Sequence, residues 1–297
     1  MKTRKKNRAP LLKLAQEILR RETTCLLTHI PVARLQKNPE AVHQVRVACR
    51  RLRAAIRLLK PLLPNTTLQL QPELKWLAQN LGPARDADIL TQQTLTFLEN
   101  TAPPQPHRKL KQQLNRAGNN ARRHMQKALQ SPRCQSLLQN LKAQDSTLPP
   151  SPPPPGISLA KLIQPLHQKL LKASRKAKPD STPAKIHRLR IHAKRLRYAM
   201  EFAAITSNPK AKALRASLIH LQDQLGLYQD AITSQNLLTS WAHSTPHSLP
   251  PPSTFLLGQL HQHLQHTAQT QLSHLTETTR QIRKTSWQSL KSCLDEN

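Results

Sequence analysis

The stretch VHQVRVACRRLRAAIRLL, residues Val42–Leu59, recurs in the chain as IHRLRIHAKRLRYAMEFA, residues Ile186–Ala203, at an offset of 144 residues. The same offset aligns LKWLAQNLGPARDA, residues Leu74–Ala87, with LIHLQDQLGLYQDA, residues Leu218–Ala231, without a gap. Self-similarity at a constant offset is the signature of repeated structure. The chain is therefore predicted to consist of two related halves.

A helical wheel divides the first copy into a basic side and an apolar side. No acidic residue lies between Val42 and Leu59, although solvated helices gain stability from oppositely charged pairs at i,i+4. The basic side is about 21 Å long at 1.5 Å per residue, and it is expected to meet an anion. We call it the first basic stripe, which consists of His43, Arg46, Arg50, Arg53 and Arg57, opposite Val45, Cys49, Leu52, Ile56 and Leu59.

The second copy repeats this division with a shorter stripe. Glu201 stands at the position that Arg57 has in the first copy, so the second stripe ends sooner. We call this set the second basic stripe, which consists of His187, Arg190, Lys194 and Arg197, opposite Ile186, Leu189, Ala193, Leu196 and Met200.

The composition favours an all-α protein with a polyanionic partner. Only 5 Gly and 3% aromatic residues among 297 argue against a sheet protein, which needs turn glycines and aromatic strand residues. The 46 Lys and Arg residues outnumber 15 Asp and Glu, for a formal net charge of +31. Such an imbalance resists compaction unless an anion is close by.

The cysteines and the N-terminus predict a cytoplasmic protein. Cys25, Cys49, Cys134 and Cys293 form no CxxC pair, as expected of reduced thiols. No apolar run is long enough to span a membrane, and the basic N-terminus is not followed by a signal-like apolar segment.

We expect four segments: a basic tail (1–9), a first four-helix half (10–143), a Pro-rich linker (144–156) and a second four-helix half (157–297). The tail is either frayed or an auxiliary anion-binding arm. Asn38 and Pro39 are predicted to open the first basic helix as N-cap and first residue. Gly82-Pro83 should break the next helix, and Gly226 takes the place of Gly82 in the second half.

These residues resemble the CHAD family, the conserved histidine α-helical domain. The resemblance rests on HxxRxxxRRxR and HxxRxxxKRxR, each followed about 40 residues later by LGxxRDA or LGxxQDA, and it covers nearly the whole chain. It implies two pseudo-symmetric four-helix bundles around a basic surface that binds inorganic polyphosphate. The chain is similar to stand-alone members, because no triphosphate-tunnel domain is visible in it. Association with polyphosphate granules is a further expectation.

The resemblance also implies which residues bind polyphosphate, with two departures. Gln229 stands in place of Arg85, and Glu201 shortens the second stripe, so the second half is expected to bind less tightly. Arg46→Glu and Arg190→Glu are each expected to weaken binding with little effect on folding. The implied residues are His43, Arg46, Arg50, Arg51, Arg53, Arg57, His187, Arg190, Lys194, Arg195 and Arg197.

Several residues keep two interpretations. His43 and His187 either donate to phosphate near a helix N-terminus or pack on a neighbouring helix. Asp86 and Asp230 either pair with an arginine of the stripes or cap a helix. Too few carboxylates converge on them for a metal site, and no cofactor is expected for the chain. The C-terminal histidines His261, His263 and His266 are either solvated or a zinc site. Secondary basic positions are Arg116, Arg122, Arg123, Lys127, Arg280, Arg283 and Lys284.

Three functions compete. The leading hypothesis is non-catalytic polyphosphate binding; the alternatives are RNA binding and a polyphosphatase or triphosphatase activity. Single-strand binders stack bases on exposed aromatics, whereas Tyr198 and Phe202 lie off the second basic stripe. Phosphoryl transfer generally uses Mg²⁺ held by carboxylates, and no acidic cluster is visible.

Overall fold

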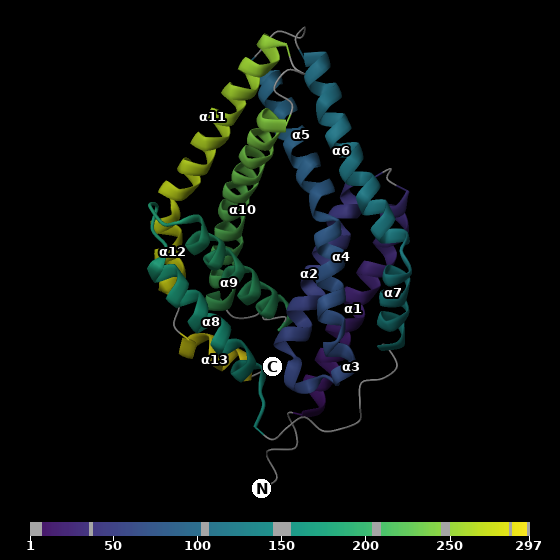
Figure 1. Ribbon diagram of the computed structural model, residues 1–297. Helices are drawn as coiled ribbons and strands as arrows, with labels where there is room; N and C mark the ends of the chain where they lie inside the picture. The colour runs from purple at the N-terminus through teal and green to yellow at the C-terminus, as the bar shows by residue number, and fades with distance from the viewer. Residues whose placement is uncertain are drawn as a thin grey trace.

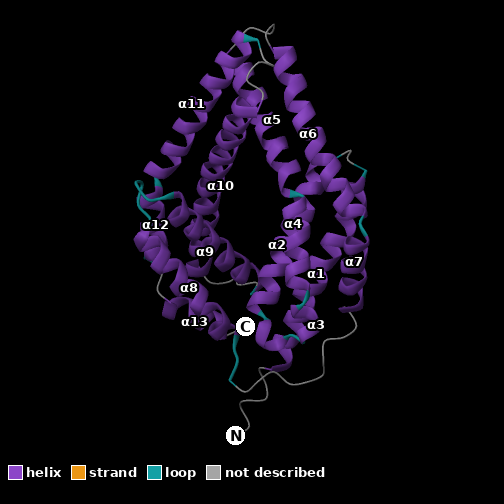
Figure 2. Ribbon diagram, in the orientation of Figure 1, coloured by secondary structure: helices purple, strands orange, loops and turns teal. Residues whose placement is uncertain are grey.

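The computed structural model describes residues 8–35, 38–101, 107–144, 156–203, 209–244, 250–284 and 287–295. Throughout these ranges the chain is helical without any strand (Figure 2), which confirms the expected all-α class. Residues 1–7 of the expected basic tail and residues 145–155 of the expected linker lie outside the described residues. None of the described helices is long and apolar enough to cross a membrane.

The first half forms seven α-helices and one short 3-10 helix. Four of them, α1, α2, α4 and α7, pack on one another as a bundle. Their fully buried side chains include Ile30, Ile56, Leu77 and Leu137, and burying one such side chain contributes roughly 1.5–3 kcal/mol. The elements are α1 (Arg8–Arg34), α2 (Pro39–Leu58), the 3-10 helix Lys60–Leu62, α3 (Asn65–Leu68), α4 (Leu70–Asn80), α5 (Gly82–Thr101), α6 (His107–Gln130) and α7 (Pro132–Gln144).

The predicted boundaries of the first half are confirmed where the sequence carries a cap or a proline. The Asn38 side chain accepts a hydrogen bond from the Glu40 backbone N–H at 2.8 Å, and Pro39 is the first residue of α2. Helix α4 ends at Asn80, and α5 begins at Gly82 with Pro83 in its first turn. Proline has no N–H to donate to the preceding turn, which favours a helix break at this point.

The second half has the corresponding bundle of α8, α9, α10 and α12, which contact one another. Helices α2 and α9 both contain 20 residues, and their bounds differ by the 144-residue offset seen in the sequence. The elements are α8 (Leu159–Lys176), α9 (Pro183–Phe202), α10 (Pro209–Ser244), α11 (Pro251–Ser273), α12 (Leu275–Arg283) and α13 (Trp287–Asp295).

Gly226, which takes the place of Gly82, does not break the helix of the second half. Helix α10 runs without interruption for 36 residues and carries Gly226 in its interior. The physical difference from the first half is the next residue, which is Leu227 rather than a proline. Glycine alone costs an exposed helix about 1 kcal/mol, which neighbouring packing offsets.

The two halves meet along a central line of contacts. Helix α2 packs on α9, α5 on α10, and α6 on α11. Figure 1 shows α5, α6, α10 and α11 rising together to one end of the molecule, while the remaining helices form the broader base. The basic stripes of α2 and α9 therefore lie in the base, where the halves come together.

Candidate functional site

The apolar side of each basic helix is buried, as the helical wheel predicts. In α2, Val45, Cys49, Leu52 and Ile56 are at most 1% exposed. In α9, the residues Ile186, Leu189, Ala193 and Leu196 are likewise at most 1% exposed. This burial fixes the rotation of both helices, so the cationic side chains are held on the opposite faces.

Arg50, Arg190 and Lys194 meet where α2 packs on α9. Burial is the largest cause that lowers the pKa of the Lys194 ammonium to about 6, followed by the positive charges of Arg50 and Arg190. Burial also lowers the pKa of Arg190, and Arg50 adds to that effect. The influence of Arg50 on two residues of the other half places the two basic stripes side by side.

A second cationic group joins the halves beyond the first. Burial lowers the pKa of the Arg195 guanidinium, and the charges of Arg57 and Arg53 lower it further. Arg195 lies off the helical-wheel stripe of α9, but the fold brings it to the end of the first basic stripe. The cationic surface between the halves thus extends beyond the shortened second stripe.

Four arginines of the stripes have a buried Nε atom without a hydrogen-bond partner in the described part of the chain. They are Arg50 and Arg53 of the first stripe, and Arg190 and Arg197 of the second. A buried donor without an acceptor costs about 1–3 kcal/mol. Buried polar atoms are usually satisfied, so these four guanidinium groups are ones to which the described part of the chain offers too few acceptors.

Arg46 has a structural role that the sequence did not reveal. Its Nη1 donates to the backbone carbonyls of Gly82 at 2.8 Å and Leu81 at 3.2 Å, at the junction of α4 and α5. The same nitrogen lies 3.8 Å from Asp86 Oδ1. Arg46 therefore supports the broken helix in addition to facing the cationic surface.

Arg46→Met is expected to lower the free energy of unfolding by about 2–3 kcal/mol, because charge-assisted hydrogen bonds contribute about 1.5–3 kcal/mol. Urea unfolding measures the change, and Arg57→Met, at an exposed position of the same helix, is the matched control. Equal stability of the two variants would contradict the structural role. This expectation replaces the earlier one that Arg46→Glu has little effect on folding.

Asp86 and Asp230 lie among the cations of both halves. Burial raises the pKa of both carboxyls, and the charges of Arg46 on Asp86 and of Arg190 on Asp230 act in the opposite direction. Asp230 also raises the pKa of Asp86, and Arg46 and Arg85 act on both carboxyls, which places the two acids near the same arginines. Because Asp230 lies inside the continuous α10, the capping interpretation does not apply to it.

The two histidines that open the stripes differ in their surroundings. His43 is half-buried, and burial lowers the pKa of its imidazole, with Arg85 as the next cause. His187 is exposed. The charge of Arg85 also lowers the pKa of Arg46, Asp86 and Asp230. Arg85 therefore lies at the cationic surface between the halves, although it was not among the predicted binding residues. Its position in the repeated LGxxRDA motif was the available signal.

Comparison with known proteins identifies the family. A family model described as CHAD domain matches residues 17–239, about three quarters of the chain. The chain belongs to the CHAD domain family. This confirms the resemblance on which the sequence analysis relied, and the ligands known for the family are related to polyphosphate.

Solved structures resemble this CHAD domain over nearly its whole length. The crystal structure of the CHAD domain from the plant Ricinus communis is 25% identical, covers 92% of each chain and has a TM-score of 0.74. PptA from Streptomyces chartreusis is 20% identical, covers 91% of this chain and 99% of its own, and has a TM-score of 0.70. Among curated proteins, none matches the sequence.

Arg51 of the CHAD domain, one of the residues expected to bind the ligand, contacts two carboxylates. Its Nε lies 2.8 Å from Glu22 Oε2, and its Nη1 lies 2.5 Å from Glu201 Oε2. Glu201, which the sequence analysis treated as the end of the second stripe, is thus a partner of the first half. Sequence reasoning missed this pair because its members are 150 residues apart.

The secondary basic positions do not converge on the central site. Arg122 Nη2 lies 2.9 Å from Asp88 Oδ1, and Arg283 Nη1 donates to the Ser174 carbonyl at 3.1 Å. Arg280 pairs with Glu277 at 3.0 Å. The others, Arg116, Arg123, Lys127 and Lys284, are exposed.

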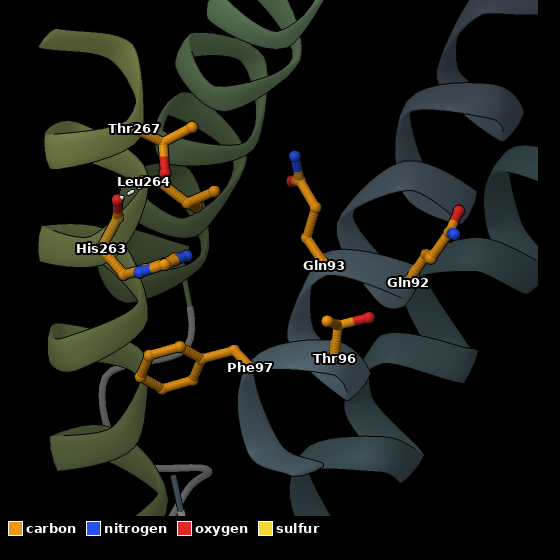
Figure 3. A pocket seen from close by; sticks show the side chains of 7 residues that line it. All are labelled: Gln92, Gln93, Thr96, Phe97, His263, Leu264 and Thr267. Carbon is orange, nitrogen blue, oxygen red and sulfur yellow. Dashed lines mark hydrogen bonds between the residues drawn. The ribbon is translucent and has the colours of Figure 1, made fainter. Parts of the chain in front are cut away.

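The histidine-rich part of α11 borders a pocket between the halves. The pocket has a volume of about 300 Å³, and Figure 3 shows Gln93 and Phe97 of α5 opposite His263 and Thr267 of α11. The Phe97 and His263 rings lie 5.4 Å apart, and Ser234 of α10 donates to Gln93 Oε1 at 2.6 Å. Within the described residues, no group of three or more His, Cys, Asp or Glu is arranged to hold a metal ion.

Proposed function

We propose that this CHAD domain binds inorganic polyphosphate without catalysis, along the cationic surface between α2 and α9. The observation that carries the proposal is the set of buried, unpartnered Nε donors on Arg50, Arg53, Arg190 and Arg197. The four guanidinium groups come from both halves, so one extended ligand between the helices can contact them together. Phosphate oxygens are strong acceptors for guanidinium groups and bind them in a bidentate manner.

The low pKa of Lys194 supports the same conclusion. An ammonium whose pKa is about 6 is held in an environment that disfavours its charge. A phosphate chain beside Arg50 and Arg190 would reverse that electrostatic balance and favour the charged form. The repulsion present in the ligand-free protein therefore becomes a source of affinity in the complex.

RNA binding is the alternative function, and the aromatic residues argue against it. Tyr198 and Phe202 of α9 are each 2% exposed, and they lie against the Arg51 guanidinium at 5.3 and 5.5 Å. They are therefore unable to stack on bases, which single-strand binding proteins generally require. A base-free phosphate chain makes no such demand.

An enzymatic function receives less support from the carboxylates near the site. Asp86 lies beside Arg46, and Asp230 is influenced first among charges by Arg190. Both therefore serve to balance arginine charge in our proposal. Release of inorganic phosphate from polyphosphate, lost on Asp86→Asn or Asp230→Asn, would instead establish a hydrolase.

Polyphosphate is expected to displace single-stranded RNA from the protein. The measurement is the fluorescence anisotropy of a labelled RNA bound to the protein, during titration with polyphosphate at equal phosphate concentration. Polyglutamate is the control polyanion, and it should displace RNA less efficiently because its charges are spaced more widely along a bulkier chain. Retention of RNA at excess polyphosphate would contradict the proposed function.

We further propose that the protein acts in the cytoplasm at polyphosphate granules. Three cysteines, Cys25, Cys49 and Cys134, are free thiols, which fits a reducing compartment. Colocalisation of a fluorescently tagged chain with polyphosphate stain tests this placement.

A further inference from the structure

Arg51 of α2 is surrounded by residues of the other half. Besides Glu201, the side chains of Tyr198 and Phe202 place their ring centroids 5.3 and 5.5 Å from the guanidinium carbon. All three belong to the C-terminal part of α9. An arginine of the first half is thus inserted between an acid and two aromatic rings of the second, a combination of ion pairing and cation–π contact.

Within the first half, Glu22 fixes the orientation of the Arg51 side chain. Glu22 of α1 is 3% exposed, and its Oε2 accepts from Arg51 Nε at 2.8 Å. Its other oxygen accepts from Arg21 at 3.2 Å. A buried carboxylate is stable only with a cation and hydrogen bonds beside it, so Glu22 fixes the rotamer with which Arg51 reaches the second half.

The contact continues to a residue of the second basic stripe. Glu201 Oε2 lies 2.5 Å from Arg51, and Glu201 Oε1 lies 3.1 Å from Arg197 Nη1. Arg197 is one of the arginines with an unpartnered buried Nε. We call the series Glu22, Arg51, Glu201 and Arg197 the interhalf network.

The interhalf network opposes a repulsion that the basic stripes create. Arg50 lies close enough to Lys194 and Arg190 to lower the pKa of both, so the ligand-free stripes tend to separate. Attraction between Arg51 and Glu201, one position along α2 from Arg50, acts in the opposite direction. A ligand that spans both stripes needs them at a fixed spacing, and supporting residues commonly provide such spacing.

We propose that Arg51 is a positioning residue, which holds the second basic stripe at the spacing that polyphosphate requires without contacting the ligand itself. This inference rests on the proposed function for its ligand, whereas the spacing of the halves is measurable without any ligand. Glu201, the partner of Arg51, has the same role in this proposal. Replacing this acid should therefore weaken the binding of a polyanion, even though the cationic surface becomes more positive.

The direction in which Glu201→Gln changes the affinity for polyphosphate distinguishes a positioning role from a general effect of net charge. Glu201→Gln raises the net charge by one, so general electrostatics predicts tighter polyphosphate binding. The interhalf network predicts that Glu201→Gln and Arg51→Gln each weaken it, by about 10-fold or more. Isothermal titration with chain-length-defined polyphosphate measures both, and Arg51→Lys should restore part of the affinity because it keeps one ion pair.

Two matched controls make the same charge changes elsewhere. Glu277→Gln removes an acid that is paired with Arg280 at 3.0 Å on the surface, and it should leave affinity unchanged or slightly tighter. Arg133→Gln removes an arginine that pairs with Glu73 at 2.6 Å and lies 4.5 Å from the Trp76 ring, all within the first half. It should have at most the small effect of one lost surface charge.

A distance measurement tests the spacing directly. Spin labels at Lys75→Cys of α4 and Lys212→Cys of α10, both exposed positions, report the separation of the halves after Cys25 and Cys293 are replaced by serine. Without ligand, the distance distribution should be narrow in the otherwise unchanged chain and should broaden or lengthen with Arg51→Gln and with Glu201→Gln. Circular dichroism verifies that the variants are helical, and Glu201→Gln decides the question if Arg51→Gln fails to fold.

The affinity and the distance distribution of Glu201→Gln decide whether Arg51 and Glu201 position the second basic stripe. Tighter or equal polyphosphate binding by Glu201→Gln, or an unchanged distance distribution in both variants, overturns the positioning role. If the unmodified chain binds no polyphosphate, the proposed function fails, and the distance distributions alone then support or overturn the role of Arg51.

Discussion

Combined Arg50→Glu and Lys194→Glu substitution is expected to abolish polyphosphate binding at physiological salt, with a loss of roughly 1,000-fold or more. Each residue contributes a charge-assisted contact of about 1.5–3 kcal/mol, and each glutamate adds repulsion. The two side chains come from different halves but influence each other electrostatically, so the double variant removes the centre of the site. Titration of polyphosphate by calorimetry gives the affinity.

The control for this double variant carries the same change in formal charge at remote positions. Lys75→Glu with Lys212→Glu places two acids on exposed sites of α4 and α10, and it should weaken binding only modestly and in a salt-sensitive manner. If both double variants lose affinity equally, net charge rather than the site between α2 and α9 determines binding.

Lys194→Met is expected to stabilise the ligand-free protein while it weakens polyphosphate binding. The pKa of the Lys194 ammonium is about 6 in the folded protein, compared with the ordinary lysine value of 10.5. Between these pH values the lysine is protonated in the unfolded chain and largely neutral in the folded one. The free energy of unfolding therefore rises with pH across this window, and at pH 7.5 the lysine still lowers it. Methionine fills a similar volume without a charge and removes that cost.

The pH dependence of thermal unfolding checks this prediction. At pH 7.5 the Lys194→Met variant should unfold at a temperature a few degrees higher than the original chain, and the difference should shrink as the pH approaches 10.5. Lys185→Met, at an exposed position of α9, is the control and should show no such trend. A Lys194→Met variant that is less stable at pH 7.5 would contradict the low pKa.

Local signals in the sequence predicted most of the helices and their ends. Asn38 and Pro39 marked the start of α2, and Gly82-Pro83 marked the break between α4 and α5, because caps and prolines act within one turn of the backbone. The match of Gly226 to Gly82 did not by itself indicate whether the second half is broken too, because a glycine permits a break without requiring one. The proline that enforces the break in the first half has no counterpart there.

The candidate site was predictable in outline and unpredictable in its internal contacts. The periodicity of the two copies indicated which cations share a face, and the buried Nε atoms of Arg50 and Arg190 fall on those faces. The pairing of Asp86 with an arginine of the stripes was predicted, and Arg46 is that arginine. The carbonyl that accepts from Arg46 and the Glu201 carboxylate beside Arg51 were not predictable, because they lie 35 and 150 residues away. Helical periodicity describes one helix and contains no information on what another helix brings to it.

The contrast between α10 and the pair α4–α5 has a mechanical consequence. Helix α10, with 36 residues, is a rod of about 54 Å at 1.5 Å per residue, and it links the basic surface to the far end of the molecule. The first half has a hinge at the corresponding level, where Arg46 donates to the Leu81 and Gly82 carbonyls. The long arm of the first half therefore depends on contacts at this junction, and we expect an anion that draws Arg46 away from those carbonyls to weaken the support of α5.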